Sequence, residues 1–147
     1  MKKGFTLIEL LIVIAVISIL IGIALPRFKG MQDEGNIAKA KGELRTLQTA
    51  IESYYIHNSS AYPAALTDLI AAATKPKIIT TVPNDPFAAA ATAYAYTRGG
   101  TSNKFYIVYS VGPDGNGSAA ISATDTVTET NGTSCIYVSN MSADAAP

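Results

Sequence analysis

The fold is decided by the stretch GFTLIELLIVIAVISILIGIAL at residues 4–25, in which Glu9 is the only charged residue. At about 1.5 Å per residue, a helix over residues 5–25 is about 31 Å long, enough to cross the hydrocarbon core of a bilayer. Lys2 and Lys3 precede this run. Positive residues favour the cytoplasmic side of a membrane, so the bulk of the chain is expected on the opposite side. The sequence therefore predicts a short leader at residues 1–4 and a membrane-spanning helix at residues 5–25.

Three explanations of the apolar run at residues 5–25 can be compared, and they differ in how they account for Glu9. A secretory signal peptide has a shorter apolar run and a small-residue cleavage site after it, whereas here the run continues into Pro26. A plain membrane anchor leaves the carboxylate of Glu9 unexplained, because a charge inside a spanning helix is costly without a partner. Cleavage between Gly4 and Phe5 would instead create a free amine one helical turn from Glu9. That amine, from the same chain or from a neighbouring copy, can neutralise the carboxylate.

The segment GFTLIEL resembles the leader junction of type IV pilins and type II secretion pseudopilins. In that family a short basic leader ends in Gly and is followed by Phe, Thr-Leu-Ile-Glu and an apolar run. The resemblance implies that a prepilin peptidase cuts after Gly4 and methylates the new amine of Phe5, and that Glu9 directs the subunit into a filament. Loss of the leader leaves 9 of the 11 basic residues against 11 acidic residues, so the mature chain carries two net negative charges.

The rest of the chain predicts an α+β domain. Pro26 cannot donate a helical hydrogen bond, so with Gly22 it predicts a kink near residues 22–26. Apolar residues then recur at spacings of three and four, which predicts an amphipathic helix over residues 26–58 with Glu43 on another face than the apolar stripe. Residues 61–72 predict a loop and a short helix. Residues 93–97, 104–110 and 134–138 predict strands, with loop from residue 111 to about Asp125.

These elements predict a pilin fold, in which a long N-terminal helix packs on a small C-terminal antiparallel sheet. Residues 59–147 are expected to form one globular domain with the amphipathic helix. The equal numbers of basic and acidic residues argue against a nucleic-acid binder. A single His and a single Cys, Cys135, argue against a disulfide framework or a Cys/His zinc site. No catalytic motif is present in the sequence, so an enzyme is not expected.

Finer features resemble the major pseudopilin of type II secretion systems, the core subunit of G type. They are Asp85-Pro86-Phe87, Tyr94-Ala95-Tyr96 and the loop Gly112-Pro113-Asp114-Gly115. The resemblance implies a calcium ion in that loop, with Asp114 and Asp125 as candidate ligands. Residues 118–124 are rich in Ser, Thr and Ala where the family has clustered acids, so an ordinary Gly/Asn/Asp turn remains the alternative. Many major type IV pilins close a loop with a disulfide, which one cysteine cannot form within a subunit.

The expected function is therefore a structural subunit that polymerises into the pseudopilus of a type II secretion system. Two alternatives stay open: the major subunit of a type IV pilus, serving adhesion, motility or extracellular electron transfer, and a membrane-anchored binding module. The resemblance implies other copies of the chain, a prepilin peptidase, an inner-membrane assembly platform and minor pseudopilins as partners. It also implies a single-pass protein of the bacterial inner membrane with its globular domain in the periplasm, which later joins a periplasmic or cell-surface filament.

Overall fold

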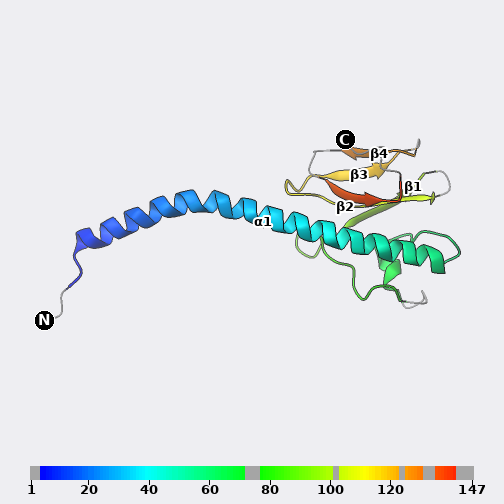
Figure 1. Ribbon diagram of the computed structural model, residues 1–147, viewed down its shortest axis with the longest axis horizontal. Helices are drawn as coiled ribbons and strands as arrows, with labels where there is room; N and C mark the ends of the chain where they lie inside the picture. The colour runs from blue at the N-terminus through cyan, green and yellow to red at the C-terminus, as the bar shows by residue number, and fades with distance from the viewer. Residues whose placement is uncertain (1–3, 72–76, 101–102, 123–124, 131–134, 142–147) are drawn as a thin grey trace. The chain divides into compact units, whose positions relative to one another are not determined.

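The computed structural model describes residues 4–71, 77–100, 103–122, 125–130 and 135–141. The chain divides into two compact units, Met1–Gly35 and Asn36–Pro147. In chain order the elements are helix α1, the 3-10 helix η1 and strands β1 to β5 (Figure 1). A long apolar N-terminal helix and a small antiparallel sheet confirm the predicted α+β class.

Helix α1 spans Leu7–His57 and is assigned without a break through Gly22 and Pro26. Pro26 leaves one helical carbonyl without its backbone donor, but the turns on both sides stay helical. A sharp kink at residues 22–26 therefore stays a prediction. An 18-residue window of α1 is apolar enough to cross a membrane, and 0% of that window is buried.

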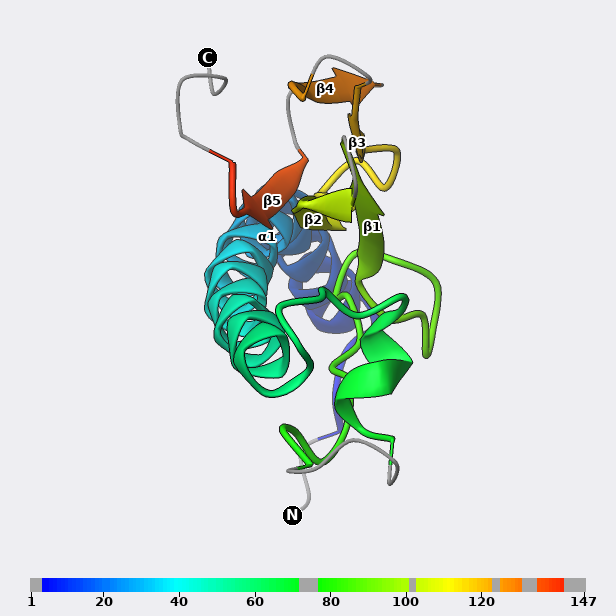
Figure 2. The same cartoon turned by 90° about the vertical axis from the view of Figure 1, so that its right-hand side faces the viewer.

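In the second unit, α1 presents one buried stripe to the sheet. Its members are Ala40, Leu44, Leu47, Ala50 and Ile51, at the spacings of three and four that the sequence predicts. They pack with Leu66 and Leu69 of η1 (Leu66–Leu69) and with Tyr106 and Val108 of the sheet. Figure 2, a view along this part of the helix, shows the strands on one side of it.

The main sheet has the order β1-β2-β5, and both pairs are antiparallel. Its strands are β1 (Ala95–Gly99), β2 (Phe105–Ser110) and β5 (Ile136–Ser139). In β1–β2 the residue pairs run from Ala95 opposite Tyr109 to Gly99 opposite Phe105. The central strand β2 is buried at Tyr106, Ile107 and Val108, so side chains on both of its faces are covered.

A second antiparallel hairpin begins inside the segment from residue 111 to about Asp125 that the sequence predicts as loop. It consists of β3 (Ser118–Ile121) and β4 (Val127–Thr130), with Ser118 opposite Thr130. Alanine and serine have low strand propensity, so the composition of β3 does not predict a strand.

Other boundaries also differ from prediction. The short helix expected in residues 61–72 is only the four-residue η1, and the expected strand 93–97 forms two residues later as β1. The last strand begins at Ile136, and Ser134 lies outside the described residues.

Candidate functional site

The predicted leader junction lies at the start of α1. Gly4, Phe5 and Thr6 precede the first helical residue, Leu7. The carbonyl of Thr6 accepts the first helical hydrogen bond, from the backbone N–H of Leu10 at 3.2 Å. Thr6 thus occupies the N-cap position. The Gly4–Phe5 peptide bond therefore lies outside the helix.

Thr6 and Glu9 also interact through their side chains. The backbone N–H of Glu9 donates to Oγ1 of Thr6 at 3.3 Å, and the Thr6 hydroxyl donates to Oε2 of Glu9 at 3.4 Å. A Thr at the N-cap with a Glu three residues on is the pattern of a capping box. The contact holds the carboxylate of Glu9 at the positive end of the helix.

The apolar side chains after this junction are exposed. Phe5 is 73% exposed, Ile8 68% and Leu25 63%, and the series continues to Phe28 and Met31. Burying one such side chain contributes roughly 1.5–3 kcal/mol, so covering the whole segment is worth tens of kcal/mol. Lipid, or the same segment of other copies, can provide that cover. Within residues 5–25 Glu9 is the only charged residue, so its carboxylate must be neutralised there.

The two candidate calcium ligands lie at opposite ends of the sheet. Asp114 follows β2, in the turn where Gly117 N–H donates to the carbonyl of Val111 at 2.8 Å. Asp125 lies beside the β1–β2 hairpin: a Cβ on Gly100 would sit 2.5 Å from Oδ1 of Asp125 and 2.6 Å from the ring of Phe105. The six-residue strand β2, about 17 Å long, separates these places.

The described contacts therefore do not bring Asp114 and Asp125 together. Among the described residues no group of three or more His, Cys, Asp or Glu side chains is placed to hold a metal ion. An ion bound near Asp114 would rely mainly on backbone and amide oxygens, a weaker donor set than clustered carboxylates. Calcium binding by the loop, with Asp114 and Asp125 as candidate ligands, stays a prediction.

The carboxylate of Asp85 holds the start of the loop that follows β2. Asp85 is 5% exposed, and its Oδ1 accepts hydrogen bonds from the Ser110 hydroxyl at 2.7 Å and from Phe87 N–H at 3.0 Å. Its Oδ2 accepts one from Val111 N–H at 2.9 Å. Three donors compensate the burial of the charge, and they join the turn before β1 to the end of β2. In the sequence, Asp85-Pro86-Phe87 supports the family resemblance and gives no signal for these long-range partners.

Two further carboxylates on α1 bind tyrosine hydroxyls of the sheet region. Tyr94 donates to Oε2 of Glu43 at 2.6 Å, and Tyr106 donates to Oε1 of Glu52 at 2.8 Å. Burial, followed by these carboxylates, raises the pKa of both phenols above the ordinary 10.0. The phenols therefore stay protonated and act as donors at neutral pH.

Comparisons with known proteins identify the family of this chain. The prokaryotic N-terminal methylation motif matches residues 1–25, and the family model of type II secretion system protein G matches residues 27–128. The chain belongs to the family of type II secretion system protein G, a family of structural pseudopilins.

Individual relatives support the family assignment. The type II secretion system core protein G of Pseudomonas aeruginosa is 29% identical over 126 residues, covering 78% of this chain and 85% of the relative. The protein of the same name from Pectobacterium carotovorum is also 29% identical over 126 residues, covering 78% of each chain. A fimbrial protein of Pseudomonas aeruginosa is 39% identical, over 64 residues covering 44% of this chain and 42% of the relative. No solved structure is significantly similar.

Proposed function

We propose that this chain is a structural subunit that polymerises into the pseudopilus, the filament of a type II protein secretion system. One observation carries the proposal: the family model of protein G matches residues 27–128, directly after a methylation motif over residues 1–25 whose 18-residue apolar window has no buried residue. The second unit has its own core, whereas the first presents apolar surface that only lipid or other copies can cover.

Processing by a prepilin peptidase is the first proposed step. The enzyme cuts the Gly4–Phe5 bond and methylates the amine of Phe5. The position of this bond before the N-cap of α1 supports the proposal, because a peptidase binds extended backbone more readily than helix. Cleavage removes Lys2 and Lys3 and creates the positive group that Glu9 lacks in the uncut chain.

Assembly then follows from electrostatics and packing. When the apolar segments leave lipid and bundle together, a Glu9 carboxylate without a partner would be strongly unfavourable. The Phe5 amine of a neighbouring copy neutralises it, and this contact sets the axial position of each new subunit. Head-to-tail contacts whose rotation does not close give an open helical filament.

Location and partners follow from the same features. We place the unassembled subunit in the bacterial inner membrane as a single-pass protein, with residues 36–147 in the periplasm, because Lys2 and Lys3 favour a cytoplasmic N-terminus. An inner-membrane assembly platform and minor pseudopilins are the proposed partners that extract it from lipid. The filament itself is periplasmic or reaches the cell surface.

The major subunit of a type IV pilus is the second candidate. The fimbrial relatives favour it, although the match quoted above covers less than half of this chain. The protein G family covers residues 27–128, and Cys135 is the only cysteine, so the pseudopilus is the better supported filament. A membrane-anchored binding module has no support from a family of filament subunits.

Replacement of Glu9 tests the assembly step. We expect Glu9→Ala to insert into the membrane normally and to be lost from sheared or pelleted filaments, because its helix no longer recruits a neighbour's amine. Glu34→Ala is the matched control, since it removes an exposed carboxylate of the same helix outside the apolar run. Filaments of Glu9→Ala in wild-type amounts would contradict the mechanism. Loss of filaments in both variants would show that the effect is not specific to Glu9.

A further inference from the structure

An apolar face of the first unit carries one cation, Arg27. A shallow pocket of about 330 Å³ lies along this part of α1, and its walls are Leu20, Ile23, Ala24, Arg27, Phe28 and Met31. These residues recur at spacings of three and four, so they share one face of the helix. Leu20 and Ile23 are each 60% exposed, and Met31 is 68% exposed. This face therefore offers apolar surface and a guanidinium to whatever surrounds the helix.

Arg27 has no acidic neighbour on this face of α1. Side chains within ion-pair reach along a helix lie three and four residues away. For Arg27 these positions hold only apolar residues and glycine: Ile23, Ala24, Gly30 and Met31. Arg27 is exposed, and within the described ranges of the chain no ion pair or hydrogen bond engages its guanidinium. Its N–H donors are therefore open to a partner outside the subunit.

The position of Arg27 along α1 corresponds to the edge of a bilayer. The distance from Phe5 to Arg27 is about 33 Å along a helix. The hydrocarbon core is about 30 Å thick, so a helix with Phe5 at one edge has Arg27 among the lipid headgroups at the other. Loss of the leader removes the basic residues before the span. In the mature chain Arg27 and Lys29 are then the basic side chains nearest to the span.

An anionic phospholipid carries both chemistries that this face can bind. A guanidinium pairs with a phosphate through two parallel hydrogen bonds, and an acyl chain covers exposed apolar side chains. An anionic headgroup suits Arg27 better than a zwitterionic one, because the phosphate of a zwitterionic lipid already has an ammonium partner of its own. Free phosphate would pair with Arg27 alone and leave Leu20 and Ile23 uncovered.

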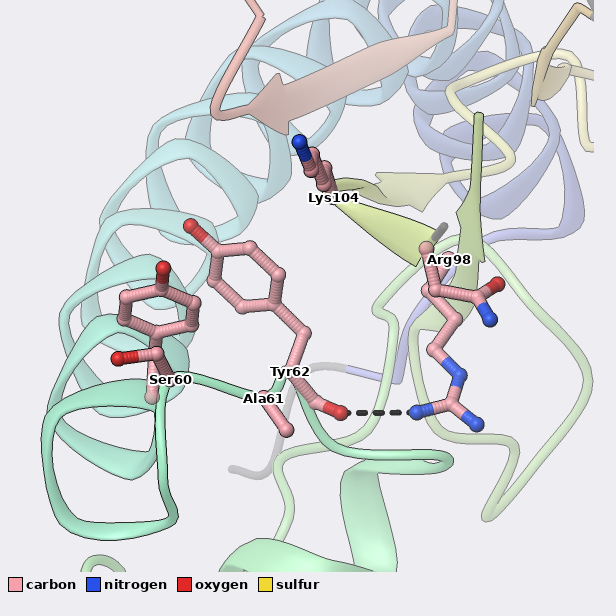
Figure 3. A pocket seen from close by; sticks show the side chains of 7 residues that line it. Ser60, Ala61, Tyr62, Arg98 and Lys104 are labelled. Atoms are coloured by element: carbon pink, nitrogen blue, oxygen red, sulfur yellow. Dashed lines mark hydrogen bonds between the residues drawn. The ribbon is translucent and has the colours of Figure 1, made fainter. Parts of the chain in front are cut away.

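A larger cavity in the second unit does not gather its charged groups in this way. It measures about 610 Å³ and lies beside the C-terminal end of α1 and the β1–β2 hairpin. Figure 3 shows the charged ends of Arg98 and Lys104 pointing to opposite ends of it. Nη1 of Arg98 already donates to the carbonyl of Tyr62 at 2.9 Å, the dashed line in Figure 3. The Tyr62 ring packs against Tyr55 and Tyr106, with centroid distances of 4.5 and 4.9 Å. The two cations therefore do not converge on one ligand.

We propose that the face of α1 around Arg27 binds one anionic phospholipid of the periplasmic leaflet. The lipid phosphate lies on Arg27, and an acyl chain runs along Leu20 and Ile23. This site rests on the proposed insertion of residues 5–25 into the membrane and adds a specific lipid to it. The contact holds the mature subunit at a fixed depth, and it is lost when the subunit leaves lipid for the filament.

Lipid titration of the detergent-solubilised full chain, followed by native mass spectrometry, tests the ligand class. The probes are phosphatidylglycerol and phosphatidylcholine with the same acyl chains, and glycerol 3-phosphate as a headgroup without chains. We expect a one-to-one adduct with phosphatidylglycerol that forms roughly tenfold more tightly than the adduct with phosphatidylcholine, as one charge-assisted pair predicts. A tenfold molar excess of glycerol 3-phosphate should not displace the lipid. Equal affinity for the two lipids, no saturable adduct, or displacement by glycerol 3-phosphate would overturn the proposal.

Two variants test the position of the lipid. Arg27→Gln should weaken phosphatidylglycerol binding about fivefold or more, within the range for one charge-assisted contact. Lys29→Gln is the matched control, because it removes the same charge two residues further on, about 200° around the helix. Lys29 also has Asp33 four residues away as a helical ion-pair partner, so its loss should change binding less than about twofold. Lys2 and Lys3 are present in both variants and cancel in the comparison. Equal losses in the two variants would show a general attraction of basic residues to anionic lipid and would overturn the site.

Flotation of the full chain with phosphatidylcholine vesicles separates this site from the proposed function. We expect the wild type, Arg27→Gln and Lys29→Gln all to float with the vesicles and to resist extraction by alkaline carbonate. Chains that insert in this way but show no preference for phosphatidylglycerol would contradict the lipid site alone. Chains that do not insert would contradict the proposed membrane-borne subunit and the lipid site together.

Discussion

Replacing Asp85 by asparagine tests how the structure holds the loop after β2. In Asp85→Asn one amide oxygen can still accept from Ser110 and Phe87, but an NH₂ group replaces Oδ2 and faces the N–H of Val111. A lost hydrogen bond to a charged group costs about 1.5–3 kcal/mol, and a donor left without an acceptor adds about 1 kcal/mol or more. We expect the free energy of unfolding to fall by about 3 kcal/mol. In a unit of this size that lowers Tm by about 10 °C.

The assay is thermal unfolding of the detergent-solubilised full chain, followed by far-ultraviolet circular dichroism. Asp114→Asn is the matched control, because Asp114 is exposed and lies in the same loop region. Its effect on the free energy of unfolding should stay within about 0.5 kcal/mol, as for most surface substitutions. If Asp85→Asn and the wild type have the same Tm, the buried carboxylate does not stabilise the loop and the account of its three hydrogen bonds is wrong.

Three further predictions concern the second unit. Burial, followed by Glu129, Asp85 and Asp114, raises the pKa of the Cys135 thiol from 9.0 to about 11. Iodoacetamide should therefore react about 100-fold more slowly with the folded than with the urea-unfolded chain at pH 8, and the gap should narrow as the pH approaches 11; equal rates at pH 8 would contradict the burial of this thiol. The folded state holds the phenol protons of Tyr94 and Tyr106 more tightly than the unfolded state, so their contribution to stability is complete below pH 10 and is lost as the pH rises further. Urea unfolding at a series of pH values should show this decline, and the loss should be smaller in Tyr94→Phe; stability that is constant up to pH 11.5 would refute the assignment. Finally, because the described residues hold no group of three or more His, Cys, Asp or Glu side chains placed to hold a metal ion, exchanging calcium for a chelator should move Tm by less than about 2 °C, whereas saturable stabilisation well above that would show a strong calcium site.

Local patterns in the sequence predicted the helix and its buried stripe. The spacing of Ala40, Leu44, Leu47 and Ile51 depends only on helical periodicity, and all four are buried in the structure. The pilin-like family is confirmed by the match to residues 27–128. The roles of Gly4, Phe5 and Glu9 stay predictions, supported by the capped start of α1 beside them.

Long-range pairing could not be predicted in this way. Glu43 was expected on a face away from the apolar stripe, yet it accepts a hydrogen bond from Tyr94, which lies 51 residues further along the chain. Asp85 likewise contacts a hydroxyl 25 residues away. The β3–β4 hairpin is built from small and β-branched residues that gain stability from pairing rather than from a hydrophobic pattern. Such contacts depend on tertiary structure, and a single sequence does not encode them as a local signal.

The central claim is that a carboxylate in the apolar helix needs a positive terminus created by cleavage. Intact-mass and N-terminal analysis of subunits recovered from assembled filaments tests it most directly. We predict that these subunits begin at N-methylated Phe5 and lack residues 1–4. Filaments built from chains that still begin at Met1 would contradict the claim, because Glu9 would then lie in the filament without the amine that neutralises it.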